Sequence, residues 1–439
     1  MMQTMNNPAT VGVISLGCSK NRVDTERMLG LLQQSGGFRF VSRPEDAEII
    51  IINTCGFIEP SKQESINTIL EMAAYKAAGS CKKLVVTGCL SQRYREELRQ
   101  ELPEVDIFLG VREYHLLPSL LQGGPASTSV QCAPIAPRVL TTPSYSAYLR
   151  IGDGCNNRCA YCAIPLIRGP LTSTPLEALW EEGERLAQDG VTELTVIAQD
   201  TSGYGVDRYN KPMLLPLLQG LCRIEKLHWV RVLYTYPDTV TPELVEGLAM
   251  EPKLCNYLDI PLQHINNQML KAMNRRGSQQ HIKQVLDWIR RNAPDFMLRT
   301  TMMVGFPGET QEQFQEMLDF LRDYPFDRVG AFAFSPEEGT VAAEMEGQVP
   351  EPVKAERLDL LMRQQAGISF QRNRARVGKV TEVLVDGIRG DTAYCRSYAE
   401  APEVDGNVLL PFREGLQPGM YVKARLTRAQ EYDIWGEEE

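Results

Sequence analysis

The sequence predicts an α/β protein of three consecutive domains: an open parallel α/β sheet, a partial (β/α)6 barrel and a small all-β barrel. Three observations lead to this prediction. Short Val- and Ile-rich segments alternate with helical segments over most of the chain, as is typical of parallel sheets. A stretch rich in Pro, Ser, Gly and Thr at 123–146 reads as a linker between two such regions. Residues 376–436 then change to short strand-like segments separated by Gly and Pro.

The first domain is expected at residues 10–122. Its strand-like segments are VGVISLGC, EIIIINTC and KKLVVTGC, and a helical segment follows each of them. Each strand-like segment ends in a cysteine, namely Cys18, Cys55 and Cys89. Ligands bind at the carboxyl ends of the strands in open α/β sheets, so we expect the three thiols to meet on one rim. The alternative for each of them is an ordinary buried cysteine at a strand end.

The second domain is expected at residues 147–367, where strand and helix alternate six times. Its candidate strands are YLRIG, ELTVIAQ, WVRVLYTY, YLDIPLQ, LRTTMMVGF and RVGAFAF. Apolar residues recur at helical spacing between them, as at Phe314 and Met317, and Thr310 with Gln313 is expected to cap that helix. Six units predict an incomplete barrel whose working face lies at the strand carboxyl ends. Its open side would admit a bulky substrate.

The third domain is expected at residues 368–436, after a long helix over 350–375. Its candidate strands are KVTEVLVDG, TAYCRSY, NVLLP and MYVKARLTRAQEYDIWG. Short strands with Gly and Pro turns predict a small barrel of the OB-like kind.

Length and composition are those of a multidomain globular enzyme. The chain has 439 residues, enough for two or three domains. Hydrophobic residues make up 43% and charged residues 23%, which is ordinary for a soluble protein. No apolar run approaches the ~18–20 residues that cross a bilayer, and the amino terminus lacks the pattern of a signal peptide. We therefore expect a cytoplasmic protein with no membrane partner.

A second group of cysteines lies in GDGCNNRCAYC, on the loop after the first strand of the predicted barrel: Cys155, Cys159 and Cys162. Thiolates bind zinc or iron–sulfur clusters. A structural zinc site needs a fourth ligand nearby, and the histidines lie elsewhere, at His115, His228, His264 and His281. Each group of three is therefore predicted to hold three irons of a four-iron cluster and to leave the fourth iron open for a substrate.

An open iron can chelate the amine and carboxylate of S-adenosylmethionine (SAM). Three residues near the strand ends are candidate SAM contacts: Tyr161, Gln199 and Asp200. The turn after the fifth strand could lie against the adenine or ribose, through Gly305, Pro307 and Gly308. Both sets have plainer explanations, since Gly-Pro-Gly serves any strand-to-helix turn and polar residues at strand ends often cap helices.

The cysteine loop at the start of a βα barrel resembles the radical-SAM signature. With the three-cysteine domain before it and the β-barrel after it, the chain resembles the methylthiotransferase family from about residue 10 to 436, and its tail resembles that family's TRAM domain. The segments SLGCSKNRVDTERM, NTCGFIEPSKQES, YLDIPLQHIN and AFSPEEGT are similar to the RimO branch, which modifies a small-subunit ribosomal protein. The tRNA-modifying branch has GCQMN- and PVQSGS-type segments instead. Phe334 stands where a tyrosine is expected.

This resemblance implies two 4Fe-4S clusters. Cys155, Cys159 and Cys162 would bind the SAM cluster, and the group at Cys18, Cys55 and Cys89 would bind an auxiliary cluster. The implied enzyme is a transferase that adds a methylthio group to the β-carbon of an aspartate in ribosomal protein uS12. One SAM methylates a sulfur at the auxiliary cluster, and a second yields the adenosyl radical that removes a hydrogen from the aspartate. A low-potential electron donor of the flavodoxin or ferredoxin type and a monomeric state are also expected.

Two other functions stay open at this point: the same chemistry on a tRNA adenosine, and a non-catalytic metal-binding RNA adaptor. The net charge helps to distinguish these RNA-related functions from action on a protein. The chain carries a net charge of −10, and residues 380–439 hold six Lys or Arg against twelve Asp or Glu. An RNA-binding barrel should present several cationic phosphate contacts, whereas an acidic one suits a basic ribosomal protein. The charge pattern therefore favours a protein substrate.

The remaining cysteines are expected to be small buried hydrophobes: Cys81, Cys132, Cys222, Cys255 and Cys395. A disulfide framework is not expected, because eleven cysteines is an odd number in a long chain without a secretion signal. Arg275 and Arg276 could hold a carboxylate, but a solvated helix face is the expectation for both.

Overall fold

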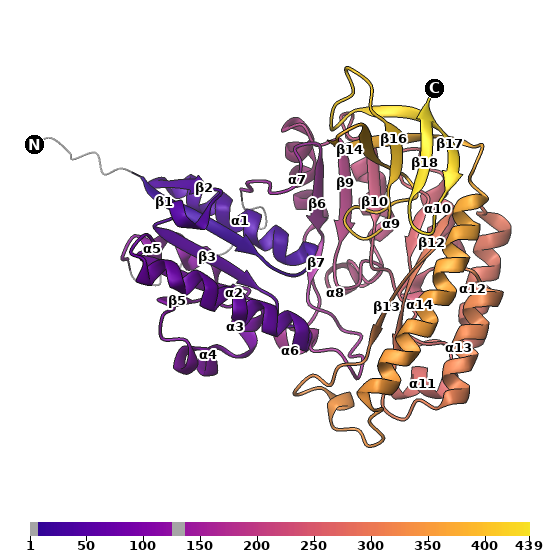
Figure 1. The fold of residues 1–439 in the computed structure, drawn as a ribbon, viewed down its shortest axis with the longest axis horizontal. Coiled ribbons are helices and arrows are strands. Elements are labelled where there is room, and N and C mark those ends of the chain that lie inside the picture. The colour runs from indigo at the N-terminus through magenta and orange to yellow at the C-terminus, as the bar shows by residue number, and fades with distance from the viewer. Residues whose placement is uncertain (1–7, 125–136) are drawn as a thin grey trace, which may run out of the picture.

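The structure is a computed structural model that describes residues 8–124 and 137–439. Figure 1 shows the amino-terminal sheet domain on the left, the central barrel beside it and the small carboxyl-terminal barrel above. The predicted fold class is confirmed. Half of the predicted linker at 123–146, with Cys132, lies outside the described residues.

The amino-terminal domain is a five-stranded parallel sheet in the order β2-β1-β3-β4-β5. Its strands are β1 (Ala9–Ser15), β2 (Phe38–Val41), β3 (Ile49–Thr54), β4 (Lys83–Gly88) and β5 (Ile107–Phe108). The helices are α1 (Ser19–Ser35), α2 (Glu59–Ala77), α3 (Cys89–Arg93), α4 (Arg95–Glu101) and α5 (Leu117–Leu121), with 3-10 turns at Pro44–Asp46 and Tyr114–Leu116. The three predicted strands are confirmed. The helix expected after the third is broken in two at Tyr94.

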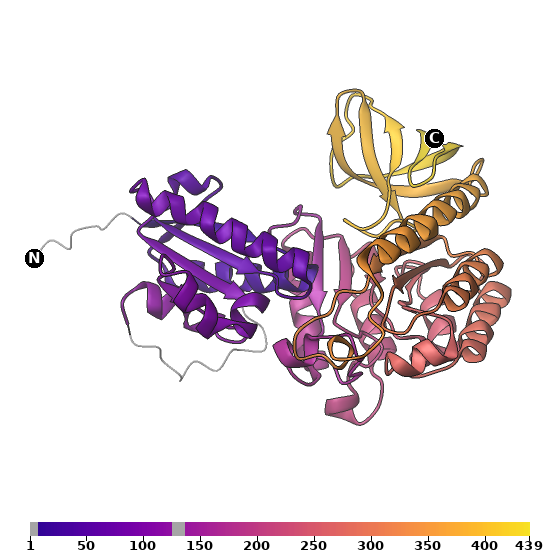
Figure 2. The same cartoon turned by 60° about the horizontal axis from the view of Figure 1, so that its bottom comes forward.

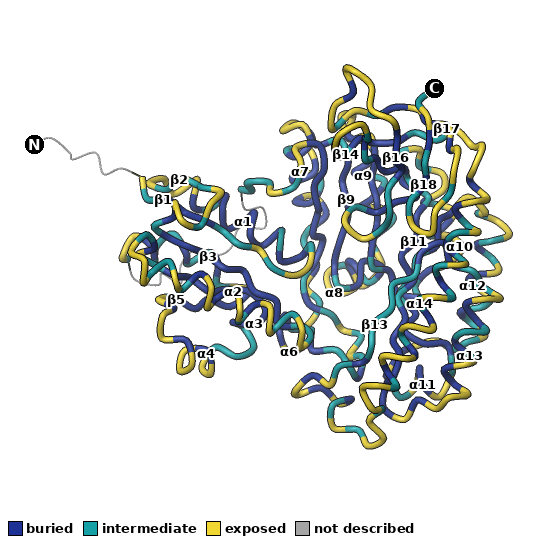
Figure 3. The backbone as a smooth tube through the Cα atoms, in the orientation of Figure 1, coloured by how far each residue is buried: buried dark blue, intermediate teal, exposed yellow. Residues whose placement is uncertain are grey.

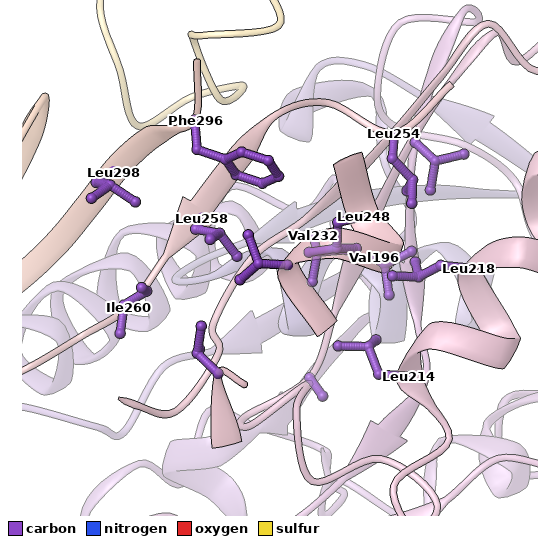
Figure 4. Close-up of a cluster of buried hydrophobic side chains, with 14 of the residues drawn as sticks. Val196, Leu214, Leu218, Val232, Leu248, Leu254, Leu258, Ile260, Phe296 and Leu298 are labelled. Atoms are coloured by element: carbon purple, nitrogen blue, oxygen red, sulfur yellow. The ribbon is translucent and has the colours of Figure 1, made fainter. Parts of the chain in front are cut away.

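The central domain contains the six predicted strands, all parallel, in two sheets of order β10-β9-β6 and β11-β12-β13. They are β6 (Ser146–Arg150), β9 (Glu193–Ile197), β10 (Trp229–Val232), β11 (Tyr257–Asp259), β12 (Met297–Val304) and β13 (Arg328–Ala333). The two sheets meet where the Thr235 N–H donates to the Asp259 carbonyl at 3.0 Å. Leucines and valines of the strands pack against the helices in one continuous core, part of which is drawn in Figure 4.

Helices cover the outside of this incomplete barrel. They are α6 (Ile164–Arg168), α7 (Leu176–Gln188), α8 (Val206–Tyr209), α9 (Leu214–Cys222), α10 (Pro242–Ala249), α11 (Asn267–Ala272), α12 (Gln279–Asn292) and α13 (Gln311–Asp323). The short strands β7 (Gly152–Asp153) and β8 (Thr172–Ser173) pair antiparallel, with the cysteine loop and α6 between them, and 3-10 turns lie at Pro237–Thr239 and Val341–Ala343. The capping box predicted for Thr310 and Gln313 is confirmed at the start of α13.

A 24-residue helix, α14 (Glu351–Arg374), leads to the last domain, and the boundary predicted between 367 and 368 falls inside it. The last domain is a closed barrel of order β14-β15-β16-β18-β17. Its strands are β14 (Val380–Arg389), β15 (Thr392–Ser397), β16 (Val408–Pro411), β17 (Tyr421–Ala429) and β18 (Ile434–Glu438). Figure 2 shows this barrel standing on α14 and the central strands.

The small barrel partly fills the open side of the central one. Ala399 and Ala401 belong to the same buried cluster as Tyr148, Leu233 and Tyr257, which project from central strands or their ends. Most of the joint lies near the amino ends of those strands, as at Tyr257, whereas Leu233 follows the carboxyl end of β10. The amino-terminal domain packs at the carboxyl ends, where Asp24 of α1 pairs with Arg150 of β6. Figure 3 shows the central strands buried and the outer helices exposed on one side. In the described parts of the chain, no helix has the length and apolar character needed to cross a membrane.

Candidate metal and cofactor site

The first three cysteines lie at one rim of the amino-terminal sheet. Cys18 follows β1, Cys55 follows β3 and Cys89 follows β4, and these three strands are neighbours in the sheet. The strand order reverses between β1 and β3, which makes this rim the topological switch point where such sheets bind ligands.

Close contacts hold the strand ends of this rim together. A Cβ added to Gly17 would lie 3.0 Å from the Cys55 Sγ, and Gly17 has a φ of +84°; only glycine lets the β1 loop pass so close to that thiol. The Asn21 amide donates to the Leu16 and Thr54 carbonyls at 3.2 and 2.9 Å. Its oxygen lies 3.5 Å from the Cys89 Sγ. Asn21 therefore ties the ends of β1, β3 and β4 around the thiols.

The second group lies on a tight loop between β7 and α6. The Cys155 N–H donates to the Gly169 carbonyl at 3.2 Å, and the Cys162 N–H donates to the Cys159 carbonyl at 3.0 Å. A Cβ on Gly154 would lie 2.1 Å from the Pro170 carbonyl oxygen. The loop is thus folded back on the turn at 169–170, and its three thiols point from one short piece of backbone.

Burial raises the pKa of Cys89, Cys155 and Cys162. It raises the pKa of Cys89 to about 12, which Arg168 opposes and the neighbouring Cys18 and Cys55 reinforce. Burial likewise raises the pKa of Cys162 to about 12 and that of Cys155 to about 11. These groups therefore keep their protons at neutral pH when no metal is present. A thiol loses its proton when it coordinates iron.

The donor sets fit iron–sulfur clusters. Among the residues that the structure describes, no three His, Cys, Asp or Glu side chains converge closely enough to bind a single metal ion. A four-iron cluster makes a different demand, because each thiolate binds a different iron. Both places offer three thiols with a cation beside them: Arg168 lies 3.6 Å from the Cys89 Sγ and Arg275 lies 3.8 Å from the Cys159 Sγ.

Packing and hydrogen bonds join the two cysteine regions. Cys89 packs with Ala163 and Ile167, which directly follow the second cysteine loop. Arg168 donates to Asn21 at 2.7 Å, to Asp24 at 2.9 Å and to Asp153 at 3.1 Å. Arg168 thus joins both cysteine regions, although nothing in the sequence pattern pointed to it.

The half-buried Tyr161 and the buried Arg275 form a pair beside the second group. The Arg275 Nη1 donates to the Tyr161 hydroxyl at 3.1 Å, and its guanidinium stacks 4.4 Å from the Tyr236 ring. Burial raises the pKa of the Tyr161 phenol, with Arg275 opposing. The solvated face expected for Arg275 is wrong, since the residue is 9% exposed. The side chain of Arg276 is 59% exposed and pairs with Asp238.

Gln199 and Asp200 were predicted to end a strand, but β9 ends at Ile197 and both residues lie on the loop that follows it. Asp200 accepts from the Asn157 amide of the cysteine loop at 2.7 Å and also from Ser202 and Gly203. Gln199 donates to Asp153 at 3.3 Å, while its buried Oε1 has no hydrogen-bond partner among the described residues. Asp200 positions the loop, and Gln199 keeps an acceptor free for a ligand.

The turn after β12 has a packing role. Gly305 has a φ of +72°, and a Cβ there would lie 2.3 Å from the Lys354 Cγ of α14. Pro307 is buried, and the exposed Gly308 donates to the Gly347 carbonyl at 2.8 Å. The need for a glycine at position 305 is thus explained by the strand-to-helix turn and its packing against α14. Contact of this turn with SAM stays a prediction.

The remaining cysteines of the described residues and Phe334 lie in the protein interior. Cys81, Cys222, Cys255 and Cys395 are buried, as expected. Phe334 is 2% exposed and its ring packs against Phe306 at 5.4 Å, so this position is filled by apolar contact.

Three protein families match the chain in order. Residues 10–110 match an uncharacterized protein family, UPF0004. Residues 149–321 match the radical SAM superfamily, and residues 377–438 match the TRAM domain. Among solved structures, the chain is similar to the radical SAM methyltransferase TsrM from Kitasatospora setae, with TM-score 0.56, 12% identity and 77% of each chain covered. The fold and the cysteine loop define a radical-SAM protein with a domain on each side of its barrel.

Named relatives identify the family to which the chain belongs among radical-SAM proteins. The chain is 46% identical to the ribosomal protein uS12 methylthiotransferase RimO of Pelotomaculum thermopropionicum, over 97% of this chain and 98% of the relative. It is 45% identical to the protein of the same name from Clostridium botulinum, over 97% of each. The chain belongs to the RimO family of methylthiotransferases.

Proposed function

We propose that this protein adds a methylthio group to the β-carbon of an aspartate in ribosomal protein uS12. The observation that carries the proposal is the connection of the two three-cysteine groups through Arg168 and through the packing of Cys89 on Ala163. The identity of 46% over nearly the whole chain to a RimO protein supports the same reaction.

In this proposal Cys155, Cys159 and Cys162 hold the SAM-binding cluster, and the rim formed by Cys18, Cys55 and Cys89 holds the auxiliary cluster. When bound, the clusters and SAM supply the sulfur, the methyl group and the radical that removes a hydrogen from the substrate.

The residues of the chain itself position the reactants and exclude water. Asp200 fixes the cysteine loop through Asn157, and the Gln199 Oε1 offers an acceptor to the SAM ammonium. The pair of Tyr161 and Arg275 closes one wall of the site. In radical chemistry, the main contribution of the protein is to hold the reactants in a fixed geometry from which water is excluded.

The proposal includes a cytoplasmic location, a low-potential electron donor of the flavodoxin or ferredoxin type, and a monomer. A basic ribosomal protein suits the acidic last domain, which holds twelve acidic and six basic residues over 380–439.

A substrate comparison tests the function. The enzyme, reconstituted with iron and sulfide, would be incubated with SAM and reductant and either uS12 or tRNA, and products read by mass spectrometry. A methylthio mass gain on uS12 is expected. A gain on tRNA alone would reject the proposal in favour of the tRNA-modifying alternative.

Iron analysis tests the site. The triple variant C18A/C55A/C89A should fall from about eight irons to about four and lose product formation while still cleaving SAM. The matched control is C81A, because Cys81 is buried at the opposite end of β4 from Cys89. It should keep both iron and product. An unchanged iron content in the triple variant would refute the assignment.

A further inference from the structure

Lys20 is a largely buried side chain beside the first group of cysteines, and its ammonium has no anionic partner among the described residues. It lies in the first turn of α1, two residues after Cys18, and is 7% exposed. Among the described residues it forms no ion pair or hydrogen bond through its side chain. Its Nζ instead lies 3.0 Å from the centre of the Tyr234 ring. The Nζ is not among the fully buried atoms that lack a partner, so it can be reached from outside. A lysine buried over most of its length is normally paired, and an anion from outside the chain could fill that role.

Tyr234 is held in place for this contact. It follows β10 at the working face of the barrel and has a φ of +64°, an uncommon value for a bulky residue. Its N–H donates to the Asp259 Oδ2 at 3.0 Å, and its carbonyl accepts from the Thr201 N–H at 2.9 Å. Strained backbone that is fixed in this way is typical of functional sites. The Lys20 ammonium is therefore located at the barrel mouth.

Two further donors lie at the same helix end. The Ser19 Oγ is buried and has no hydrogen-bond partner among the described residues. The first backbone bond of α1 runs from the Arg22 N–H to the Cys18 carbonyl at 3.1 Å, so the N–H groups before it have no intrahelical acceptor. An ammonium, a hydroxyl and the positive end of a 17-residue helix together favour a carboxylate.

We propose that Lys20, resting on Tyr234, binds the carboxylate of the substrate aspartate. This inference rests on the proposed function. The carboxyl carbon of aspartate is bonded directly to the β-carbon, so fixing the carboxylate also fixes the carbon that is modified. Lys20 is a specificity-determining residue that selects aspartate over a neutral side chain of the same shape.

The test compares uS12 with its variant that carries asparagine at the modified position. Equilibrium binding of each to the reconstituted enzyme is measured without SAM, together with the KM and kcat for uS12. Wild-type enzyme should bind the aspartate form more tightly. In K20M that preference should fall roughly tenfold to hundredfold, the range for a hydrogen bond to a charged group, and K20R should restore part of it.

Controls separate this role from support of the cluster. K20M should keep its iron content and its SAM cleavage without substrate. K82M is the matched control, because Lys82 lies at the other end of the sheet with its side chain 71% exposed, and it should behave as wild type.

Three results would overturn the inference: loss of iron in K20M, equal weakening of both uS12 forms, or unchanged discrimination. If wild-type enzyme fails to modify uS12 at all, the proposed function fails first, and the two failures are thereby distinguished.

Discussion

The two ends of the central barrel face different kinds of neighbour. At the strand amino ends, the small barrel docks through carboxylates that are fully paired. Glu193 accepts two hydrogen bonds from Arg396, both at 2.7 Å, and one from Ser146. Glu400 accepts from Arg328 and Arg376. Burial alone would raise the pKa of these carboxyls, but their arginine partners hold both at about 2.

At the strand carboxyl ends, polar groups are left without partners inside the described chain. They include the Lys20 ammonium and the buried Ser19 Oγ and Gln199 Oε1. Buried polar groups are normally hydrogen-bonded, and the joint also has exceptions, at the Arg231 and Arg328 Nε. The carboxyl ends differ because their unpartnered groups include an ammonium next to the first group of cysteines. The comparison teaches that one end of the barrel is a permanent joint and the other is a binding chamber.

The variant R396M tests the joint between the two barrels and should have the largest effect. It leaves the buried Glu193 charge without its main partner, so we expect the free energy of unfolding to fall by about 3–5 kcal/mol. Urea unfolding monitored by fluorescence measures the change. The double variant E193Q/R396M should recover much of the loss, since no isolated charge remains. A stable R396M protein would show that the joint is not held by this pair.

Acid should weaken the same joint. Because Glu193 and Glu400 have pKa values near 2 in the folded protein, their stabilisation is present above about pH 4.5 and is lost as the pH falls towards 2. Each loss approaches about 3 kcal/mol at the acid limit. Urea midpoints between pH 7 and pH 3 should fall more steeply for wild type than for E193Q/R396M. Parallel profiles would contradict the assignment.

At the chamber, R168M should affect iron more than folding. Asp24 keeps its second partner, Arg150, at 2.5 Å, but the cation beside Cys89 is lost. Groups that support metal ligands typically contribute 10–100-fold in metal affinity, so faster iron loss to a chelator is expected. R43M is the control, because that side chain is 66% exposed. Equal rates of iron loss in R168M and wild type would show that Arg168 only joins the domains.

The smallest effect is expected for R413M. Arg413 pairs with Glu438 on the surface of the small barrel, and its side chain is 52% exposed. Exposed pairs contribute about 0–1 kcal/mol. Urea unfolding should therefore barely change, and a loss as large as that of R396M would remove the distinction between buried and surface pairs.

Several elements could be predicted from local sequence. Runs such as IIIIN in β3 are buried throughout and reveal their strand by composition. The strands β2 and β5 were missed because β2 is a four-residue edge strand with no buried residue and β5 has only two residues. Tertiary pairing forms such strands more than their own composition does.

The sequence by itself determined the six cysteines, their places at strand ends or on one loop, and the order of the three domains, because ligand spacing and hydrophobic periodicity are local properties. Only the tertiary structure placed Lys20 over Tyr234 and Arg168 between the two groups of cysteines. The contact between Arg168 and Cys89 joins residues 79 positions apart, and Lys20 and Tyr234 are still farther apart along the chain. These contacts form because specific charges are buried at the domain interfaces. No local sequence pattern encodes which of those charges will meet.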